Sequence, residues 1–123
     1  MSILFDDDDL PSRLHELSEA ARHELPFGLV GLDPQGRVDF YSRHERERSG
    51  WGDREITGLD FFGSVAPCMD TPQIRGRIEQ DHGERGLDVE VGHTGDFADR
   101  TRMFRVRMMS RPDGGFWLAH HRD

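Results

Sequence analysis

The sequence predicts an α+β fold: a five-stranded antiparallel sheet with helices packed on one face and a helical cap at the N-terminus. Three observations predict it: two short apolar runs joined by a turn, helix-start signals at the beginning and middle, and alternating runs in the last third. One domain is expected at 123 residues. We expect residues 1–25 to form the cap and residues 26–123 the main domain.

The predicted cap begins after four consecutive acids, Asp6–Asp9. Apolar residues then recur at intervals of three and four, at Leu10, Leu14, Leu17 and Ala21. Asp9 is placed to cap this helix, and Pro11 suits an early helical position. Such a short helix is marginal by itself, so it must dock on the rest of the protein.

Two strands are predicted next, over residues 27–33 and 37–41. The Asp33-Pro34-Gln35-Gly36 sequence between them fits a type I turn. Residues 42–60 are polar and irregular, with short helical turns. A compact apolar patch follows them, made by Phe61, Phe62, Val65 and Ala66.

A helix is predicted from Thr71-Pro72 to about Gly83 or Gly86, with Ile74 and Ile78 as its apolar stripe. The last third reads as three strands, over residues 87–93, 102–109 and 116–121. The turn residues 112–115 join the last two strands as a hairpin.

The composition excludes several kinds of chemistry. All 16 basic residues are arginine, so there is no lysine for a Schiff base or a phosphate-binding loop. The single cysteine, Cys68, excludes an internal disulfide and a multi-cysteine zinc site, and the histidines lack metal-ligand spacing. A net charge of −8 argues against nucleic acid as a partner. Neither a membrane span nor a secretory signal is found, which predicts a cytoplasmic protein.

Cys68 is where covalent small-molecule chemistry would take place. Most free cysteines are small buried hydrophobic residues, and this remains the plain interpretation. However, Cys68 follows a proline and precedes a predicted helix start, where exposed N–H groups favour a thiolate. Tyr41 ends a predicted strand, with Glu45 four residues later. The two share a face if the chain turns helically there, or else serve separately at the sheet edge and on a solvated helix.

The stretch from Phe27 to about Ile78 resembles photoactive yellow protein, the bacterial blue-light receptor family with the PAS fold. The resemblance rests on FG in LPFGLVGLD, on the DPQG turn, on Tyr41 with Glu45, and on TGLDFFGSVAPCMDTPQIRG. Cys68 follows Val65-Ala66-Pro67 as in the family, and no gap separates it from Tyr41 and Glu45. The C-terminal strands fit more loosely. The resemblance implies a PAS-type sensor domain over residues 26–123.

The resemblance implies that Cys68 carries p-coumaric acid as a thioester. Tyr41 and Glu45 would donate hydrogen bonds to its phenolic oxygen, and Ser49 stands where the family has threonine. Trp51 replaces an arginine that covers the chromophore pocket. Further pocket residues that it implies are Val30, Phe61, Ala66, Pro67 and Phe97.

A light-driven signalling cycle without substrate turnover is the function that the resemblance implies. Burial is expected to keep Glu45 protonated in the dark. After light isomerises the chromophore, Glu45 would give up its proton, and the resulting buried charge would release the cap formed by residues 1–25. The implied partners are the chromophore and an unknown downstream signalling protein, with no nucleic acid or membrane, in a monomer or weak dimer.

Two other functions stay open at this point. One is a PAS interaction module that has kept Cys68, Tyr41 and Glu45 but carries no chromophore. The other is a reactive thiol at Cys68, acting as a redox sensor or acyl-transfer nucleophile. No histidine is placed by the sequence to activate such a thiol.

Overall fold

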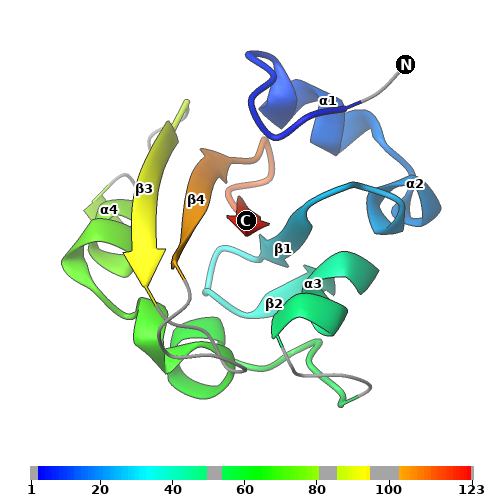
Figure 1. Cartoon of the computed structure of the whole chain (residues 1–123). Coiled ribbons are helices and arrows are strands. Elements are labelled where there is room, and N and C mark those ends of the chain that lie inside the picture. The colour runs from blue at the N-terminus through cyan, green and yellow to red at the C-terminus, as the bar shows by residue number, and fades with distance from the viewer. Residues whose placement is uncertain (1–2, 50–53, 81–85, 95–102, 123) are drawn as a thin grey trace.

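The computed structural model describes residues 3–49, 54–80, 86–94 and 103–122. Its centre is one antiparallel sheet of five strands in the order β2-β1-β5-β4-β3 (Figure 1). The strands are β1 (Gly28–Leu32), β2 (Val38–Tyr41), β3 (Asp88–Thr94), β4 (Met103–Ser110) and β5 (Phe116–Arg122). The predicted α+β fold and five-stranded antiparallel sheet are therefore confirmed.

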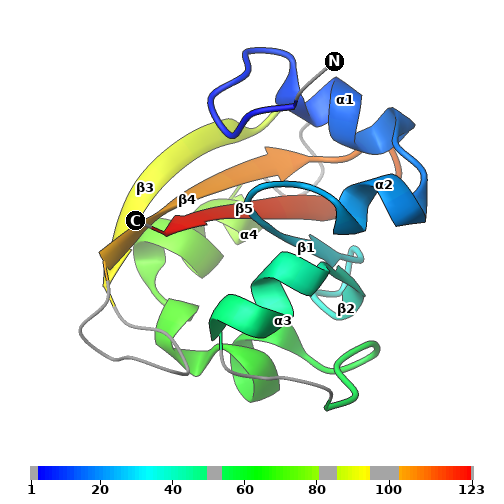
Figure 2. The same ribbon diagram turned by 45° about the vertical axis from the view of Figure 1, so that its right-hand side comes forward.

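Helices lie on both faces of the sheet (Figure 2). Helices α1 (Leu10–Glu16) and α2 (Glu19–His23) form the cap over one face. The other face carries α3 (Arg43–Ser49), η1 (Phe61–Val65), η2 (Pro67–Met69), η3 (Pro72–Gly76) and α4 (Arg77–Gln80). Each face has its own apolar core, because strand side chains alternate between the two. We call these the helical-face core and the cap-face core.

The cap is two short helices where one helix was predicted over Leu10–Ala21. The backbone turns extended at Leu17, and the Ser18 side chain then caps α2 by accepting a hydrogen bond from the Ala21 N–H. Asp9 was expected to cap α1, but its side chain makes no such bond and pairs with Arg13. Leu10 and Leu14 dock in the cap-face core as expected.

The β1–β2 hairpin determines where Tyr41 faces. Asp33 and Gly36 close the predicted turn through a 2.9 Å backbone hydrogen bond, with Gly36 at a positive φ of 83°. The register then slips between Gly31 and Leu32, so Asp39 is an extra residue in β2. This bulge puts Val38 and Tyr41 on the helical face, although they are three residues apart.

The middle of the chain is more helical and less regular than predicted. The apolar patch at residues 61–65 is a π-helical turn, and the helix that begins after Thr71 starts as a second one, η3. Thr71 caps η3 as predicted, because its side chain accepts a hydrogen bond from the Ile74 N–H. The predicted end of this helix, at Gly83 or Gly86, falls at or beyond residues 81–85, which lie outside the described residues.

None of the helices among the described residues has the length and apolar character needed to cross a membrane.

Candidate functional site

Tyr41 lies buried at the end of β2, beneath α3. Its hydroxyl donates a hydrogen bond to Ser49 Oγ at 3.0 Å, and the Arg46 guanidinium lies 5.7 Å from the ring centre. Burial, together with the negative charge of Glu45, raises the pKa of Tyr41. The phenol of Tyr41 is therefore held neutral, as a hydrogen-bond donor with a defined partner.

Glu45 is carried by α3 and held against the sheet by two local features. The buried Ser42 hydroxyl accepts hydrogen bonds from the Leu29 N–H at 2.9 Å and the Glu45 N–H at 3.2 Å, which ties the helix start to β1. Gly28 leaves the space that the Glu45 carboxylate fills, because a Cβ at this position would collide with Oε1. Both features bring the carboxylate of Glu45 into the interior, where it is 2% exposed.

An ion pair with Arg122 fixes the charge of Glu45. The two guanidinium nitrogens lie 2.6 and 2.9 Å from the carboxylate oxygens, a bidentate arrangement. Burial by itself would raise the pKa of Glu45, but His120 and Arg122 outweigh it and lower the pKa to about 2. In this arrangement Glu45 is therefore the ionised partner of Arg122. The protonated dark state of Glu45, which was expected for the protein with its chromophore attached, stays a prediction.

His120 completes this polar group from β5. It lies directly opposite Gly28 in the β1–β5 register. Because Gly28 has no side chain, the Glu45 carboxylate of α3 can approach His120 of β5. Its Nδ1 lies 3.0 Å from Glu45 Oε2, although the ring is not aligned for a hydrogen bond. The Nε2 atom is buried and has no hydrogen-bond partner among the described residues.

Sequence reasoning missed both His120 and Arg122. It considered the histidines only as metal ligands, and it noted correctly that His120 and His121 point to opposite faces of a strand. In the structure the His120 ring packs on Phe104 of the helical face, while His121 packs on Phe5 of the cap. The available signal was the alternation in β5, which puts His120 and Arg122 on the same face as Leu118.

Cys68 lies in η2, between Pro67 and the buried Met69. The Cys68 residue is exposed, so a reagent can reach it, whereas the neighbouring segment packs inward. Phe61, Val65 and Met69 belong to the same core as Tyr41, and Ala66 packs against that core. The thiol-bearing turn and the buried phenol of Tyr41 are thus attached to one apolar cluster.

The other predicted pocket residues are placed as follows. Val30 pairs with Tyr41 across the β1–β2 hairpin, and both share the helical-face core with Phe61. Ser49 contacts Tyr41, while Pro67 is exposed. Trp51 and Phe97 lie outside the described residues.

The chemistry of these residues fits an attached phenol. The exposed thiol of Cys68 suits acylation. Tyr41 brings a buried hydroxyl, and His120 brings a buried ring nitrogen that has no hydrogen-bond partner among the described residues. The carboxylate of Glu45 is bound to Arg122 in this structure, so its predicted donation to the phenolic oxygen requires that it first take up a proton. Within the described ranges, no group of three or more His, Cys, Asp or Glu side chains could hold a metal ion.

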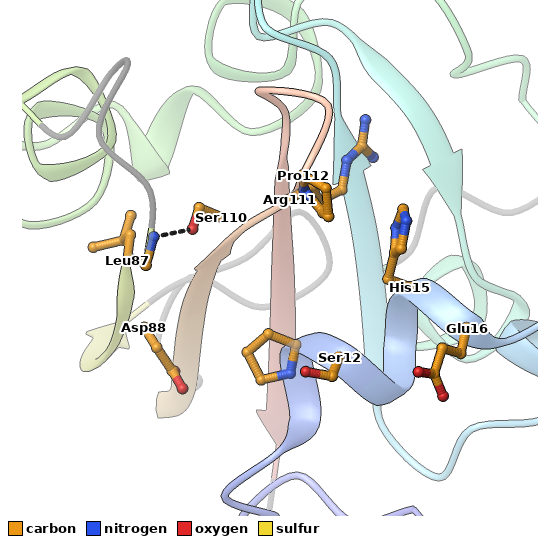
Figure 3. A pocket seen from close by; sticks show the side chains of 10 residues that line it. Ser12, His15, Glu16, Leu87, Asp88, Ser110, Arg111 and Pro112 are labelled. Carbon is orange, nitrogen blue, oxygen red and sulfur yellow. Dashed lines mark hydrogen bonds between the residues drawn. The ribbon is translucent and has the colours of Figure 1, made fainter.

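A hollow of about 540 Å³ lies elsewhere, between α1 and the ends of β3 and β4 (Figure 3). Its walls include Ser12, His15, Leu87 and Pro112. The nearby Arg111 guanidinium is already bound by Asp39 and Asp113, so it offers no charge to a ligand. The hollow shows that the cap packs incompletely over this part of the sheet.

The ion pair predicts that protonating Glu45 destabilises the fold. The folded-state pKa of Glu45 lies below its ordinary value, so its contribution is complete above about pH 4.5 and is lost as the pH falls towards 2. We expect wild type to lose on the order of 2 kcal/mol more than Glu45→Gln across this range, measured by chemical unfolding. Glu47→Gln is the control, because Glu47 is exposed on the same helix. Equal slopes for wild type and Glu45→Gln would contradict the ion pair.

Comparisons with known proteins agree with this geometry. The chain is 31% identical over 102 residues to photoactive yellow protein from Rhodobacter capsulatus, covering 81% of this chain and 82% of the relative. It is 26% identical over 117 residues to photoactive yellow protein from Rhodothalassium salexigens, covering 94% of each. No protein-family model matches the chain.

A solved structure shows the same fold. It is the photoactive yellow protein domain of the sensor histidine kinase Ppr from Rhodospirillum centenum, with a TM-score of 0.79 and 25% identity. The match covers 91% of this chain and 99% of that domain. The PAS fold expected from the sequence is therefore confirmed.

Proposed function

The chain belongs to the photoactive yellow protein family, and from that membership we propose that it is a blue-light receptor that carries p-coumaric acid as a thioester on Cys68. The observation that carries the proposal is an exposed thiol on a turn that packs into the core of Tyr41. When bound, p-coumaric acid supplies blue absorption and a double bond that light isomerises. No substrate turnover is part of the proposal.

The residues of this chain would bind, orient and respond to the group. Cys68 Sγ forms the thioester by displacing the leaving group of an activated acyl donor. Tyr41 offers its O–H to the phenolic oxygen, while Ser49 and the apolar side chains around Phe61 hold Tyr41 in place. Hydrogen bonds to a charged acceptor are about twice as strong as neutral ones, so Tyr41 favours the ionised phenol.

The signal would leave through the cap. We propose residues 1–25 as the cap and residues 26–123 as the sensor domain. A change of charge near Glu45 acts on β1 and β5, which carry Leu29, Trp117 and Ala119 of the cap-face core on their other side. The cap consists of two short helices of seven and five residues, which depend on docking to stay folded, so we propose it as the element that is released. Its release would expose a surface to a downstream partner in the cytoplasm.

One observation favours a second candidate, a PAS interaction module without a chromophore. The ion pair between Glu45 and Arg122 neutralises the buried carboxylate without any ligand. A buried carboxylate that already has a bidentate partner has less need of a bound phenol.

Labelling with activated p-coumarate separates the two candidates. We expect wild type to gain one adduct by mass, to absorb in the visible and to bleach under blue light, and Cys68→Ala to gain none. Ser64→Cys in the Cys68→Ala background is the control, because Ser64 is exposed on the neighbouring turn η1. It should label without acquiring visible colour. A colourless wild-type adduct, or equal labelling of Cys68→Ala, would leave the chromophore-free module as the better account.

A further inference from the structure

The two edges of the sheet differ in how their backbone is covered. At the β2 edge, residues 58–60 run alongside the strand: the Val38 N–H donates to the Leu59 carbonyl at 2.9 Å, and the Gly58 N–H donates to the Val38 carbonyl at 2.8 Å. At the other edge, β3 forms the rim of the sheet and β4 is its neighbour on one side (Figure 1 and Figure 2). An uncovered strand edge is a template on which another strand can pair.

The register of β3 shows which of its backbone groups face outward. The Ser110 N–H donates to the Leu87 carbonyl at 2.9 Å, in the same antiparallel register that pairs Val89 with Met108. Hydrogen-bonded pairs alternate along an antiparallel ladder, so the odd-numbered residues of β3 bond to β4. The N–H and C=O groups of its even-numbered residues point away from β4 and have no hydrogen-bond partner among the described residues; these are Asp88, Glu90, Gly92 and Thr94.

Strand β3 lacks the features that usually block pairing at an edge. Its seven residues, DVEVGHT, include no lysine or proline, and they pair with β4 without a bulge. The carboxylates of Asp88 and Glu90 are bound by Arg107 and Arg105, each at 2.7 Å, so they do not repel a second strand as free acids would. The edge can therefore accept a strand whose side chains match its own.

We propose that two copies of this chain pair antiparallel along β3 and form one continuous sheet with twofold symmetry. Full overlap of the seven residues puts Val91 opposite Val91 of the second copy and Glu90 opposite Gly92. The outward groups of Glu90 and Gly92 then bond to each other across the axis, as do those of Asp88 and Thr94. No acid faces another acid in this register, whereas a register with Glu90 on the axis would place two carboxylates face to face. Strand β3 is thus complementary to itself, as a twofold dimer requires.

Pairing along β3 would also cover apolar surface on the helical face. Val89 and Val91 are partly buried and pack against the helical-face core. In the dimer, Val91 meets its own copy and Val89 meets His93, in the pairs whose side chains approach most closely because they exchange no backbone hydrogen bonds. This surface is separate from the residues around Cys68 and Tyr41, so the dimer does not depend on the proposed function.

Two substitutions at Gly92 test the register, because a Cβ at this position meets no atom within 4 Å. Gly92→Glu would place a carboxylate opposite Glu90 of the second copy, twice in each dimer, so the dimer should weaken about tenfold. Gly92→Arg would place a cation there and should tighten the dimer by a similar factor. Sedimentation of the full chain measures both effects, at concentrations around an expected dissociation constant on the order of 100 μM.

The same substitutions act in the opposite sense on the fold, which separates loss of the dimer from loss of stability. Gly92 lies opposite Arg105 of β4, so Gly92→Glu gains an attractive neighbour within its own chain and Gly92→Arg gains a repulsive one. Chemical unfolding of dilute, monomeric protein should therefore show Gly92→Glu to be at least as stable as Gly92→Arg.

Amide hydrogen exchange locates the interface without any substitution. The N–H groups of Glu90 and Gly92 should gain protection as the protein concentration rises through the dimer midpoint. Those of Val89 and Val91 already bond to β4, so their exchange should change little. A wild type that stays monomeric up to about 1 mM would overturn the proposal. So would a dimer that neither protects these amides nor responds to the two Gly92 substitutions.

Discussion

Arg122→Met should destabilise the protein by about 3–5 kcal/mol at neutral pH, which is the largest loss of stability that we expect from a single substitution. Glu45 would keep a buried carboxylate whose two bidentate hydrogen bonds are lost. Methionine fills much of the volume over Phe104, so the loss reports the missing charge more than a cavity. Chemical unfolding at pH 7 measures the change in free energy of unfolding.

Two controls separate the charge from the packing. The double variant Glu45→Gln with Arg122→Met removes both charges, so it should recover a large part of the loss, with a coupling energy of at least about 2 kcal/mol. The loss in Arg122→Met should also shrink as the pH falls, because an unpaired buried Glu45 can then accept a proton. If the double variant is as unstable as the sum of the single ones, the two side chains are independent and the ion pair has no energetic role.

The ion pair of Glu45 with Arg122 also shows which contacts could not be predicted from the sequence. The Tyr41–Glu45 spacing predicted a shared face only if the chain turns helically after Tyr41. Helix α3 provides that turn, and both residues are buried. Arg122 reaches Glu45 from 77 positions away, so the contact depends on which strands are neighbours in the sheet. With β5 beside β1, the last strand delivers its charges to the first turn of α3.

In the cap too, local patterns predicted some features and missed others. Apolar spacing predicted one helix over Leu10–Ala21. Instead, α1 ends at an extended Leu17, and the Ser18 side chain caps a second helix, α2. The Asp33–Gly36 turn and the Thr71 cap were predictable because their side chains bond within a few residues. The bulge at Asp39, which turns Tyr41 towards the helical face, leaves no such signature in a four-residue strand.

Arg107→Met should release the cap from the sheet under native conditions. Arg107 is buried in β4 and holds residues 5–7 through hydrogen bonds from its Nη1 to the carbonyls of Phe5, at 2.9 Å, and Asp7, at 2.7 Å. Its Nε and Nη2 bind both oxygens of Asp88 at 2.7 Å. Charge-assisted hydrogen bonds contribute about 1.5–3 kcal/mol each when they are buried, so we expect the cap to lose about 2–3 kcal/mol. The open population should then rise about 100-fold, measured by protease cleavage within residues 1–25 and by exchange of the Leu10 and Leu14 amides.

Arg105→Met is the matched control, because Arg105 lies on the same strand and holds the same segment through Asp6. Its guanidinium is more exposed than that of Arg107, and exposed ion pairs contribute little, so cleavage should stay close to wild type. The contrast decides whether one buried arginine holds the cap or whether the apolar contacts of Leu10 and Leu14 suffice. Equal cleavage of wild type and Arg107→Met would assign the cap's attachment to the apolar contacts alone. A light signal would then have to loosen the cap-face core directly, since weakening a single polar contact would not release residues 1–25.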